Sequence, residues 1–187
     1  MRVRLLIALL VASFSAHAAE SLADRTQKKI DLIESDTAKP GSVFVFTLSE
    51  LNAWARAKIP TIVPEGFRQA RLELGNNTAV GYALIDFLKL RSASGVETNW
   101  LIAKLIQGEK PVKVNARMQS GNGRATVFLT RVEIGGLSVS GATLDFLIHT
   151  FFMPIYPDAK IGAPFGLKHR IDRMEATPTE VRVYIKK

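Results

Sequence analysis

Alternation of apolar and polar residues in three stretches constrains the fold of this chain more than any other feature. Each stretch holds two alternating runs separated by a short segment rich in Gly, Asn, Pro or Thr. The stretches are 70–84, 112–134 and 167–186, with turns at 75–77, 121–123 and 177–180. Because successive side chains of a strand point to opposite faces, this pattern is typical of β-hairpins. The sequence therefore predicts three antiparallel hairpins.

The first hairpin has a face of small residues, and the second has a break in its alternation. In the first hairpin, Ala79, Gly81 and Ala83 share one face, which either lets another element pack closely or leaves that face thin. In the second hairpin, the apolar phase shifts near Thr130, and such a shift predicts a β-bulge.

Three further segments have helical patterns. Thr47-Leu48-Ser49-Glu50 has the form of a capping box and introduces a helix at 49–58. We expect this helix to stop at Pro60, because the residue before a proline avoids the helical region. Two apolar helices are expected later in the chain, at 97–107 and at 142–153.

The segment LDFLIHTFFMPIYP at 144–157 is apolar almost throughout. A helix that is apolar on all sides is either buried or associated with a membrane, and this one is shorter than the ~20 residues that span a bilayer. It is therefore the plug of a core, the wall of a lumen for a lipid, or an interfacial anchor. Asp145 and His149 lie four residues apart on it and point to one side, as the polar edge of a helix does.

The start of the chain has the three parts of a secretory signal peptide. Arg2 and Arg4 are basic, 5–14 is an apolar run, and Ala16-His17-Ala18 is a small-residue cleavage motif. We therefore divide the chain into a signal peptide at 1–18, a polar leader or short helix at 19–41, and a single α+β domain at 42–187.

Composition supports export and limits the partners. The expected compartment is a bacterial periplasm, with the extracellular space as the alternative, and a chain without Cys must be stabilised by its core. Removal of the two signal-peptide arginines lowers the formal charge from +8 to +6. The remaining basic residues are dispersed, so we expect contact with a membrane surface or an envelope component and no nucleic-acid partner.

The sequence offers no motif of a known catalytic class. It lacks G-x-S-x-G and a Walker A motif, and the absence of Cys excludes thiolate chemistry. A metal site on Asp145 and His149 needs a third ligand, for which His169 and Asp158 are the candidates. We predict a non-enzymatic protein with no catalytic residue, no metal and no cofactor.

The order and texture of the elements resemble a known superfamily. TLSELNA opens a helix, RLELGNNTAVGYALIDF and KVNARMQSGNGRATVFLTRVEIGGLSVSG form hairpins, and an apolar helix and a closing hairpin follow. Over most of 43–186 this is similar to small bacterial envelope proteins of the tubular lipid-binding (TULIP-like) superfamily. The resemblance implies a curved sheet that wraps a helix and encloses a lumen for acyl chains, with no catalytic residues.

The expected fold is therefore α+β: a long curved antiparallel sheet, built from hairpins and wrapped on two or three helices. The expected function is binding of an apolar ligand, a lipid or an acyl chain, between sheet and helices. The alternative is a structural or protein-interaction module of the cell envelope with no ligand. The candidate ligand-binding residues are Trp54, Trp100, Leu101, Leu105, Leu144, Leu147, Ile148, Phe151 and Phe152.

Overall fold

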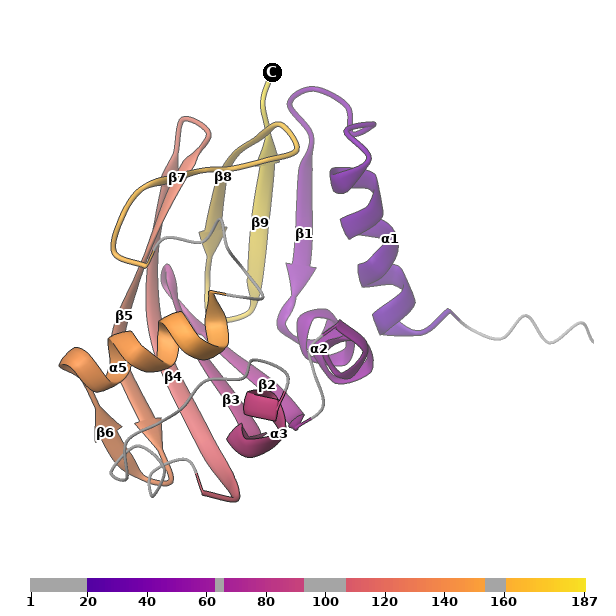
Figure 1. Cartoon of the computed structure of the whole chain (residues 1–187). Coiled ribbons are helices and arrows are strands. Elements are labelled where there is room, and N and C mark those ends of the chain that lie inside the picture. The colour runs from indigo at the N-terminus through magenta and orange to yellow at the C-terminus, as the bar shows by residue number, and fades with distance from the viewer. Residues whose placement is uncertain (1–19, 63–65, 93–106, 154–160) are drawn as a thin grey trace, which may run out of the picture.

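The structure, a computed structural model, describes residues 20–62, 66–92, 107–153 and 161–187 (Figure 1). Within these ranges the chain is an α+β fold with two antiparallel sheets. The helices are α1 (Leu22–Glu34), α2 (Leu48–Ile62), α3 (Phe87–Ser92), α5 (Gly141–Leu147) and the π-helical turn η1 (Ile148–Phe152). The strands are β1 (Val43–Thr47), β2 (Phe67–Gly75), β3 (Thr78–Asp86), β4 (Glu109–Gly121), β5 (Arg124–Ile134), β6 (Leu137–Val139), β7 (Phe165–Gly166), β8 (Ile171–Ala176) and β9 (Glu180–Ile185). The predicted signal peptide, 1–18, lies outside the described residues.

The first two predicted hairpins are confirmed and form most of a six-stranded antiparallel sheet. Its order is β2-β3-β4-β5-β6, and β7 pairs with β5. Asn122 and Gly123 in the β4–β5 turn both have positive φ, 53° and 72°, as a two-residue hairpin turn requires. The predicted bulge is confirmed as well, because Asn115 pairs with Arg131 and Ala116 pairs with Leu129, which leaves Thr130 as the extra residue.

The third predicted hairpin is confirmed as β8–β9, but it belongs to a separate sheet. This sheet has the order β1-β9-β8, so the expected single sheet is divided into two. Side chains join the sheets where the hairpin tips meet β8. Ser120 Oγ donates to the Met174 carbonyl at 2.6 Å and accepts from its N–H at 2.7 Å, and Asn77 Oδ1 accepts from Ala176 N–H at 3.1 Å. Alternation predicts the faces of a strand and does not predict which edges pair.

The first two helices begin at side-chain caps. The segment predicted as a leader or a short helix contains α1. Ser21 caps the N-terminus of this helix, because its Oγ accepts a hydrogen bond from Asp24 N–H at 3.1 Å. The predicted capping box is confirmed, because Glu50 N–H donates to Thr47 Oγ1 at 3.2 Å and Thr47 N–H donates to Glu50 Oε2 at 2.9 Å. The expected stop at Pro60 is wrong. Proline fits the helical φ, and in the last turn it removes a single backbone hydrogen bond.

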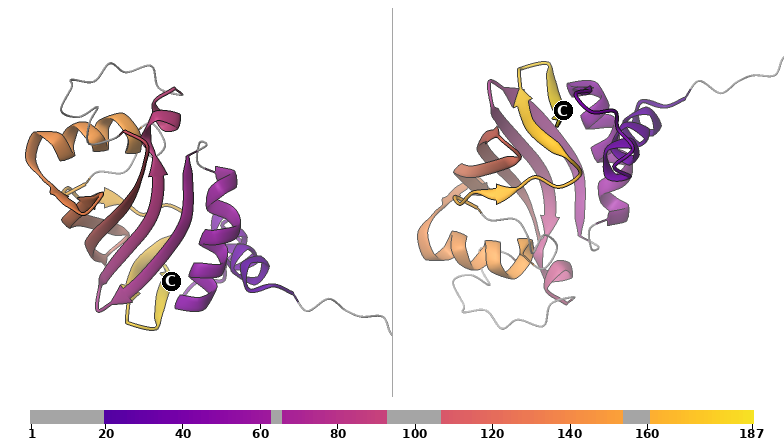
Figure 2. Two further views of the ribbon diagram at one scale, coloured as in Figure 1. Left: turned by 90° about the horizontal axis from the view of Figure 1, so that it is seen from below. Right: turned by 90° about the horizontal axis from the view of Figure 1, so that it is seen from above.

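Two apolar cores hold the helices against the sheets. One contains Phe46, Val183 and Ile185 of the three-stranded sheet together with Ile33 of α1. The other contains Val112, Val132, Ile134 and Val139 of the six-stranded sheet together with Leu147 of α5. Figure 2 shows α1 and α2 on one side of the molecule and α5 on the other, with strands between them.

The register of the six-stranded sheet defines its inner face. Gly81 lies between Leu72 of β2 and Val114 of β4, and Val114 lies beside Val132 of β5. These residues share one face, which we call the inner face because Val132 lies in the core beneath α5. The opposite side is the outer face. Among the described residues, no helix is long and apolar enough to cross a membrane.

Candidate functional site

Helix α2 is fixed to the free edges of both sheets. Asn52 Nδ2 donates to the Leu72 carbonyl at 2.9 Å, and Leu72 N–H donates to Asn52 Oδ1 at 2.8 Å, so the amide pairs with the edge of β2 as a strand would. At the other sheet, Lys29 Nζ donates to the Val45 carbonyl and to Glu50, at 2.7 and 2.8 Å. These contacts hold α2 beside the inner face of β2–β4.

The Lys29–Glu50 pair is the main electrostatic feature of this anchor. The Glu50 residue is buried, at 7% exposure. Burial acts to raise the pKa of its carboxyl group, but the hydrogen bonds from Lys29 and Thr47 outweigh burial and hold the pKa below its ordinary value. The carboxylate is therefore charged at neutral pH and helps to close the edge of β1.

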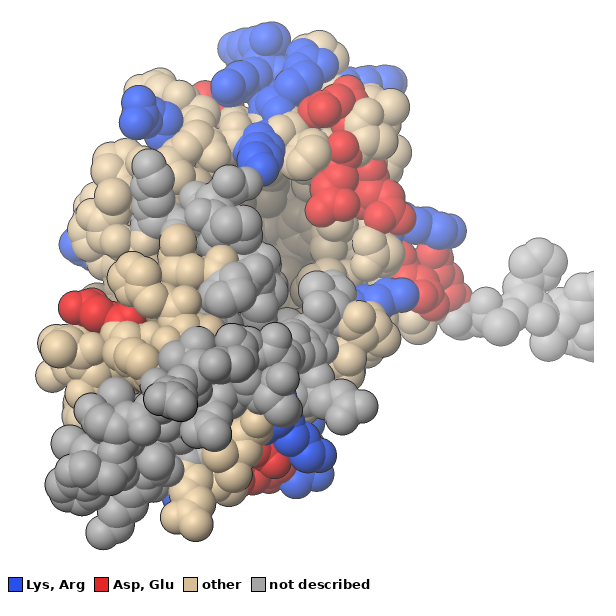
Figure 3. All heavy atoms as spheres, viewed as in Figure 1, with Lys and Arg blue, Asp and Glu red and all other residues tan. Residues whose placement is uncertain are grey.

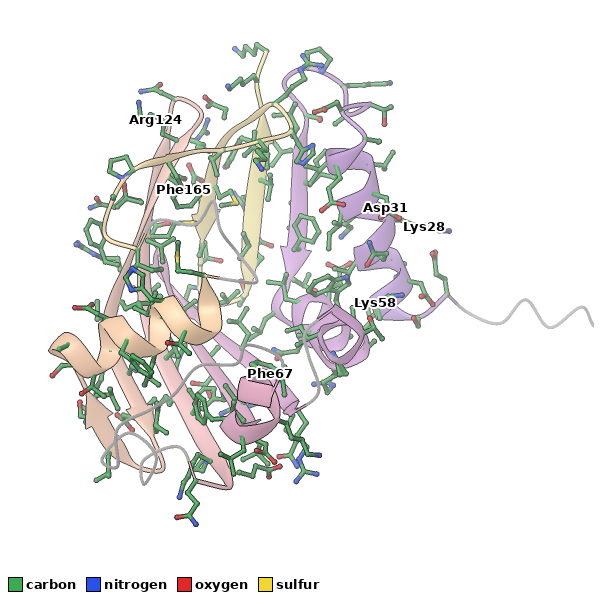
Figure 4. All side chains as sticks on the ribbon, viewed as in Figure 1. Lys28, Asp31, Lys58, Phe67, Arg124 and Phe165 are labelled. Carbon is green, nitrogen blue, oxygen red and sulfur yellow. The ribbon has the colours of Figure 1, made fainter. Side chains whose placement is uncertain are left out.

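An apolar cavity of about 320 Å³ lies between α2 and the inner face. From α2 it is lined by Leu51, Trp54, Ala55 and Ile59. From the strands it is lined chiefly by Phe67, Ala70, Leu72, Gly81, Ala83, Ile85, Val112 and Val114. Figure 4 places Phe67 at the start of β2, close to α3. The lining is thus made almost wholly of aliphatic and aromatic groups.

Gly81 accounts for part of this empty space. A Cβ atom placed on Gly81 would meet no atom of the described residues within 4 Å, and its φ is not in the left-handed region. The backbone therefore does not require glycine here. Glycine weakens a strand and often marks a close approach of another group, so a larger residue would be expected unless the space has a use. Ala70 and Ala83 keep the neighbouring floor equally shallow.

The polar groups at the cavity already have partners. Trp54 Nε1 donates to Gln27 Oε1 of α1 at 2.7 Å, which satisfies the indole N–H. Arg71 forms an ion pair with Glu73, and Tyr82 Oη donates to Glu73 at 2.8 Å. Hydrogen bonds from Arg71 and Tyr82 lower the pKa of Glu73. The arrangement suits an uncharged hydrocarbon and offers no convergent acid, base or nucleophile in the described lining.

The structure separates the residues that the sequence suggested for a ligand site. Trp54 lines the cavity. Leu147 lies instead in the core of the six-stranded sheet at 6% exposure, Leu144 packs against that core, and Ile148 is half-buried in η1. The side chains of Phe151 and Phe152 lie outside the described part of the structure. So do Trp100, Leu101 and Leu105, together with the predicted helix at 97–107.

The predicted helix at 142–153 is present as α5 and η1, and its polar pair makes a local contact. His149 Nδ1 lies 2.8 Å from the backbone oxygen of Asp145, and both residues are exposed. In the part of the chain that the structure describes, no three His, Asp or Glu side chains are grouped as metal ligands.

Sequence reasoning missed most of the cavity lining. Leu51 and Ala55 flank Trp54 on the apolar side of α2, and the small residues at 79, 81 and 83 mark the thin face of the first hairpin. These two signals predict that something lies against the thin face. They do not show that α2 is this element, since that depends on the pairing of Asn52 with Leu72.

Positive and negative side chains occupy different parts of the described surface. On the side of the molecule shown in Figure 3, Lys and Arg gather at the upper end and Asp and Glu along the side of α1, while much of the remaining described surface is uncharged.

Comparison with models of protein families, with curated proteins and with solved structures finds no match to this chain.

Proposed function

We propose that the protein is an exported, non-enzymatic binder of an apolar ligand, a lipid or an acyl chain, and that the cavity beside α2 holds the chain. The observation that carries the proposal is the unfilled space at Gly81, in the middle of an apolar lining. A strand position that has room for a Cβ atom, yet carries no side chain, keeps the cavity open.

The size and lining of the cavity support a small hydrocarbon ligand. At about 320 Å³ it lies at the lower end of the range of roughly 300–1,000 Å³ that is usual for ligand pockets. A single aliphatic chain suits this volume better than a lipid with two chains. Each CH₂ group moved from water into the cavity would contribute about 0.8 kcal/mol.

The resemblance to tubular lipid-binding proteins supports the same proposal. On this view the six-stranded sheet curves around its helices, and the cavity is the lumen of that arrangement. The signal peptide proposed at 1–18 would deliver the protein to the periplasm, or to the extracellular space, where it would meet envelope lipids. No cofactor is needed for binding of this kind.

The test is lipid extraction from the mature protein purified from envelope fractions, with Gly81→Leu as the blocking variant. The wild type should yield about one lipid chain per protein, and Gly81→Leu should yield little. Gly121→Leu is the matched control, because Gly121 is also in a strand, lacks a left-handed φ and has open space around it. Equal lipid yields from wild type and Gly81→Leu, or no lipid at all, would refute the proposal.

One observation favours the alternative, a structural or interaction module of the envelope without a ligand. Leu137 lies on the short edge strand β6 and is 64% exposed. An exposed leucine at a strand edge suits contact with another protein. This alternative predicts a lipid-free protein in which Leu137→Asp abolishes co-purification of an envelope partner.

A further inference from the structure

The outer face of the six-stranded sheet carries a second hollow, of about 570 Å³. The register places one row of side chains across four strands: Arg71 pairs with Tyr82, Tyr82 with Lys113, and Lys113 with Glu133. All four line this hollow, together with Arg56 of α2. Since Gly81, next to Tyr82, faces inward, the side chains of this row project from the opposite side of the sheet, although Arg71 and Tyr82 contribute to the linings of both hollows.

Two charged side chains of this row, Arg71 and Glu133, form ion pairs with neighbours on their own strands. Arg71 is paired with Glu73 and stacks over the Tyr82 ring at 4.0 Å, and Glu133 is paired with Arg131 at 2.6 Å. Lys113 Nζ lies 5.8 Å from the centre of the Tyr82 ring.

The other two cations of the hollow are Arg56 and Lys113, and the charge of Lys113 acts on Glu73 and helps to lower the pKa of that carboxyl group. Within the described ranges, neither Arg56 nor Lys113 has an ion pair or a side-chain hydrogen bond. Arg71 contributes a third positive group, which its contacts with Glu73 and Tyr82 hold in place. The described lining of the hollow therefore carries three positive side chains and one negative side chain, Glu133.

The backbone at the edge of the hollow is irregular. Gln69 has a φ of 55°, which is unusual for a residue other than glycine, and it lies where the pairing of β2 with β3 shifts between Arg68 and Arg71. Such conformations are energetically unfavourable and are concentrated at functional sites. The bulge lies in the edge strand beside α2, and Gln69 lines the hollow together with Arg56.

We propose that this hollow binds a phosphate group on a small polyol, either as a free phosphorylated alcohol or as the headgroup of a lipid. Arg56 and Lys113, which have no ion pair among the described residues, supply positive charge for the dianion of a phosphate monoester or the monoanion of a lipid phosphodiester. Arg side chains also match phosphate oxygens in two-point hydrogen bonding. Leu84 and Pro111, which also line the hollow, offer an apolar floor for the carbon part. Arg56 and Lys113 line the hollow and not the apolar cavity, although the two linings share Ala70, Arg71, Tyr82, Ala83 and Val112.

The experiment measures binding of two probes by the mature protein at low and at physiological salt. The probes are glycerol phosphate, followed by calorimetry, and phosphatidylcholine vesicles with and without phosphatidylglycerol, followed by co-sedimentation. The variants are Arg56→Gln, Lys113→Gln and both together. Arg117→Gln is the matched control: Arg117 lies on the same strand and the same face as Lys113, stacks on Phe128 at 5.0 Å, and is outside the hollow.

Each single variant should weaken binding about tenfold, the double variant should weaken it further, and Arg117→Gln should leave it unchanged. Binding of glycerol phosphate with this pattern supports a soluble ligand. Binding of phosphatidylglycerol vesicles alone, with the same pattern, supports a lipid headgroup. Failure of both probes, or equal weakening by Arg117→Gln, overturns the proposal. Gly81→Leu should not change these affinities, so the two sites can fail independently.

Discussion

Replacement of Gly81 by valine should stabilise the ligand-free protein, although Gly81 lies in the interior of the sheet. The site has room for a Cβ atom, the neighbouring cavity can take the two methyl groups, and φ is not in the left-handed region. β-propensity favours valine over glycine by up to about 1 kcal/mol, and cavity-filling substitutions commonly add about 0.5–2 kcal/mol. We expect a gain of about 1–2 kcal/mol, or a rise in Tm of about 2–8 °C for a chain of this size.

The gain is measured by urea unfolding of the delipidated proteins, followed by tryptophan fluorescence. Added ligand should reverse the order of stability. At a hundred times its Kd, a ligand stabilises the wild type by about 2.7 kcal/mol, whereas a variant with a filled cavity should gain almost nothing. The crossing of the two stabilities distinguishes a blocked site from a general change in stability.

The sign of the change in unfolding free energy for Gly81→Val shows whether the space at Gly81 is empty in solution. If the space at Gly81 is already filled in solution, valine overpacks it and should cost about 1–3 kcal/mol. A destabilised Gly81→Val variant would therefore refute the cavity. Gly121→Val, at the end of β4 and outside the described lining of the cavity, should leave ligand stabilisation unchanged.

Three further predictions concern the contacts that position the site. Asn52→Asp should lower the free energy of unfolding by about 1–3 kcal/mol, because it replaces the donor that binds the Leu72 carbonyl by a second acceptor; urea denaturation measures it. Ser120→Ala should cost a similar amount, since it removes the partner of both backbone groups of Met174, while Ser138→Ala on the exposed face of β6 should cost almost nothing. The Glu50 carboxyl has a pKa below its ordinary value of 4.5 in the folded state, so its stabilising contribution is complete above that value and is lost as the pH falls through the lower folded pKa. Urea unfolding between pH 3 and pH 7 should therefore show a steeper loss of stability for the wild type than for Glu50→Gln, and parallel curves would contradict this assignment.

Local structure was predictable because local chemistry determines it. The three hairpins follow from period-two alternation and turn residues, and the bulge at Thr130 follows from the shift of apolar phase. The start of α2 follows from the reciprocal hydrogen bonds of Thr47 and Glu50. In each case the signal and the structure lie within a few residues of one another.

The division into two sheets and the position of the cavity were not predictable in this way. They depend on contacts between distant residues, such as Asn77 with Ala176, which are 99 residues apart, and Asn52 with Leu72. We expected ligand-binding residues in the segment at 144–157 because nearly all of its residues are apolar. The described part of that segment places Leu147 in a packed core, while an ordinary amphipathic helix, α2, forms the wall of the cavity.

Native mass spectrometry of the delipidated protein with palmitic acid measures directly whether the cavity beside α2 holds one acyl chain. Binding in this cavity predicts one added fatty acid per wild-type chain, an equal mass shift for Gly121→Leu, and no shift for Gly81→Leu. A wild-type chain that takes up no fatty acid, or a Gly81→Leu variant that takes up as much as the wild type, would contradict it.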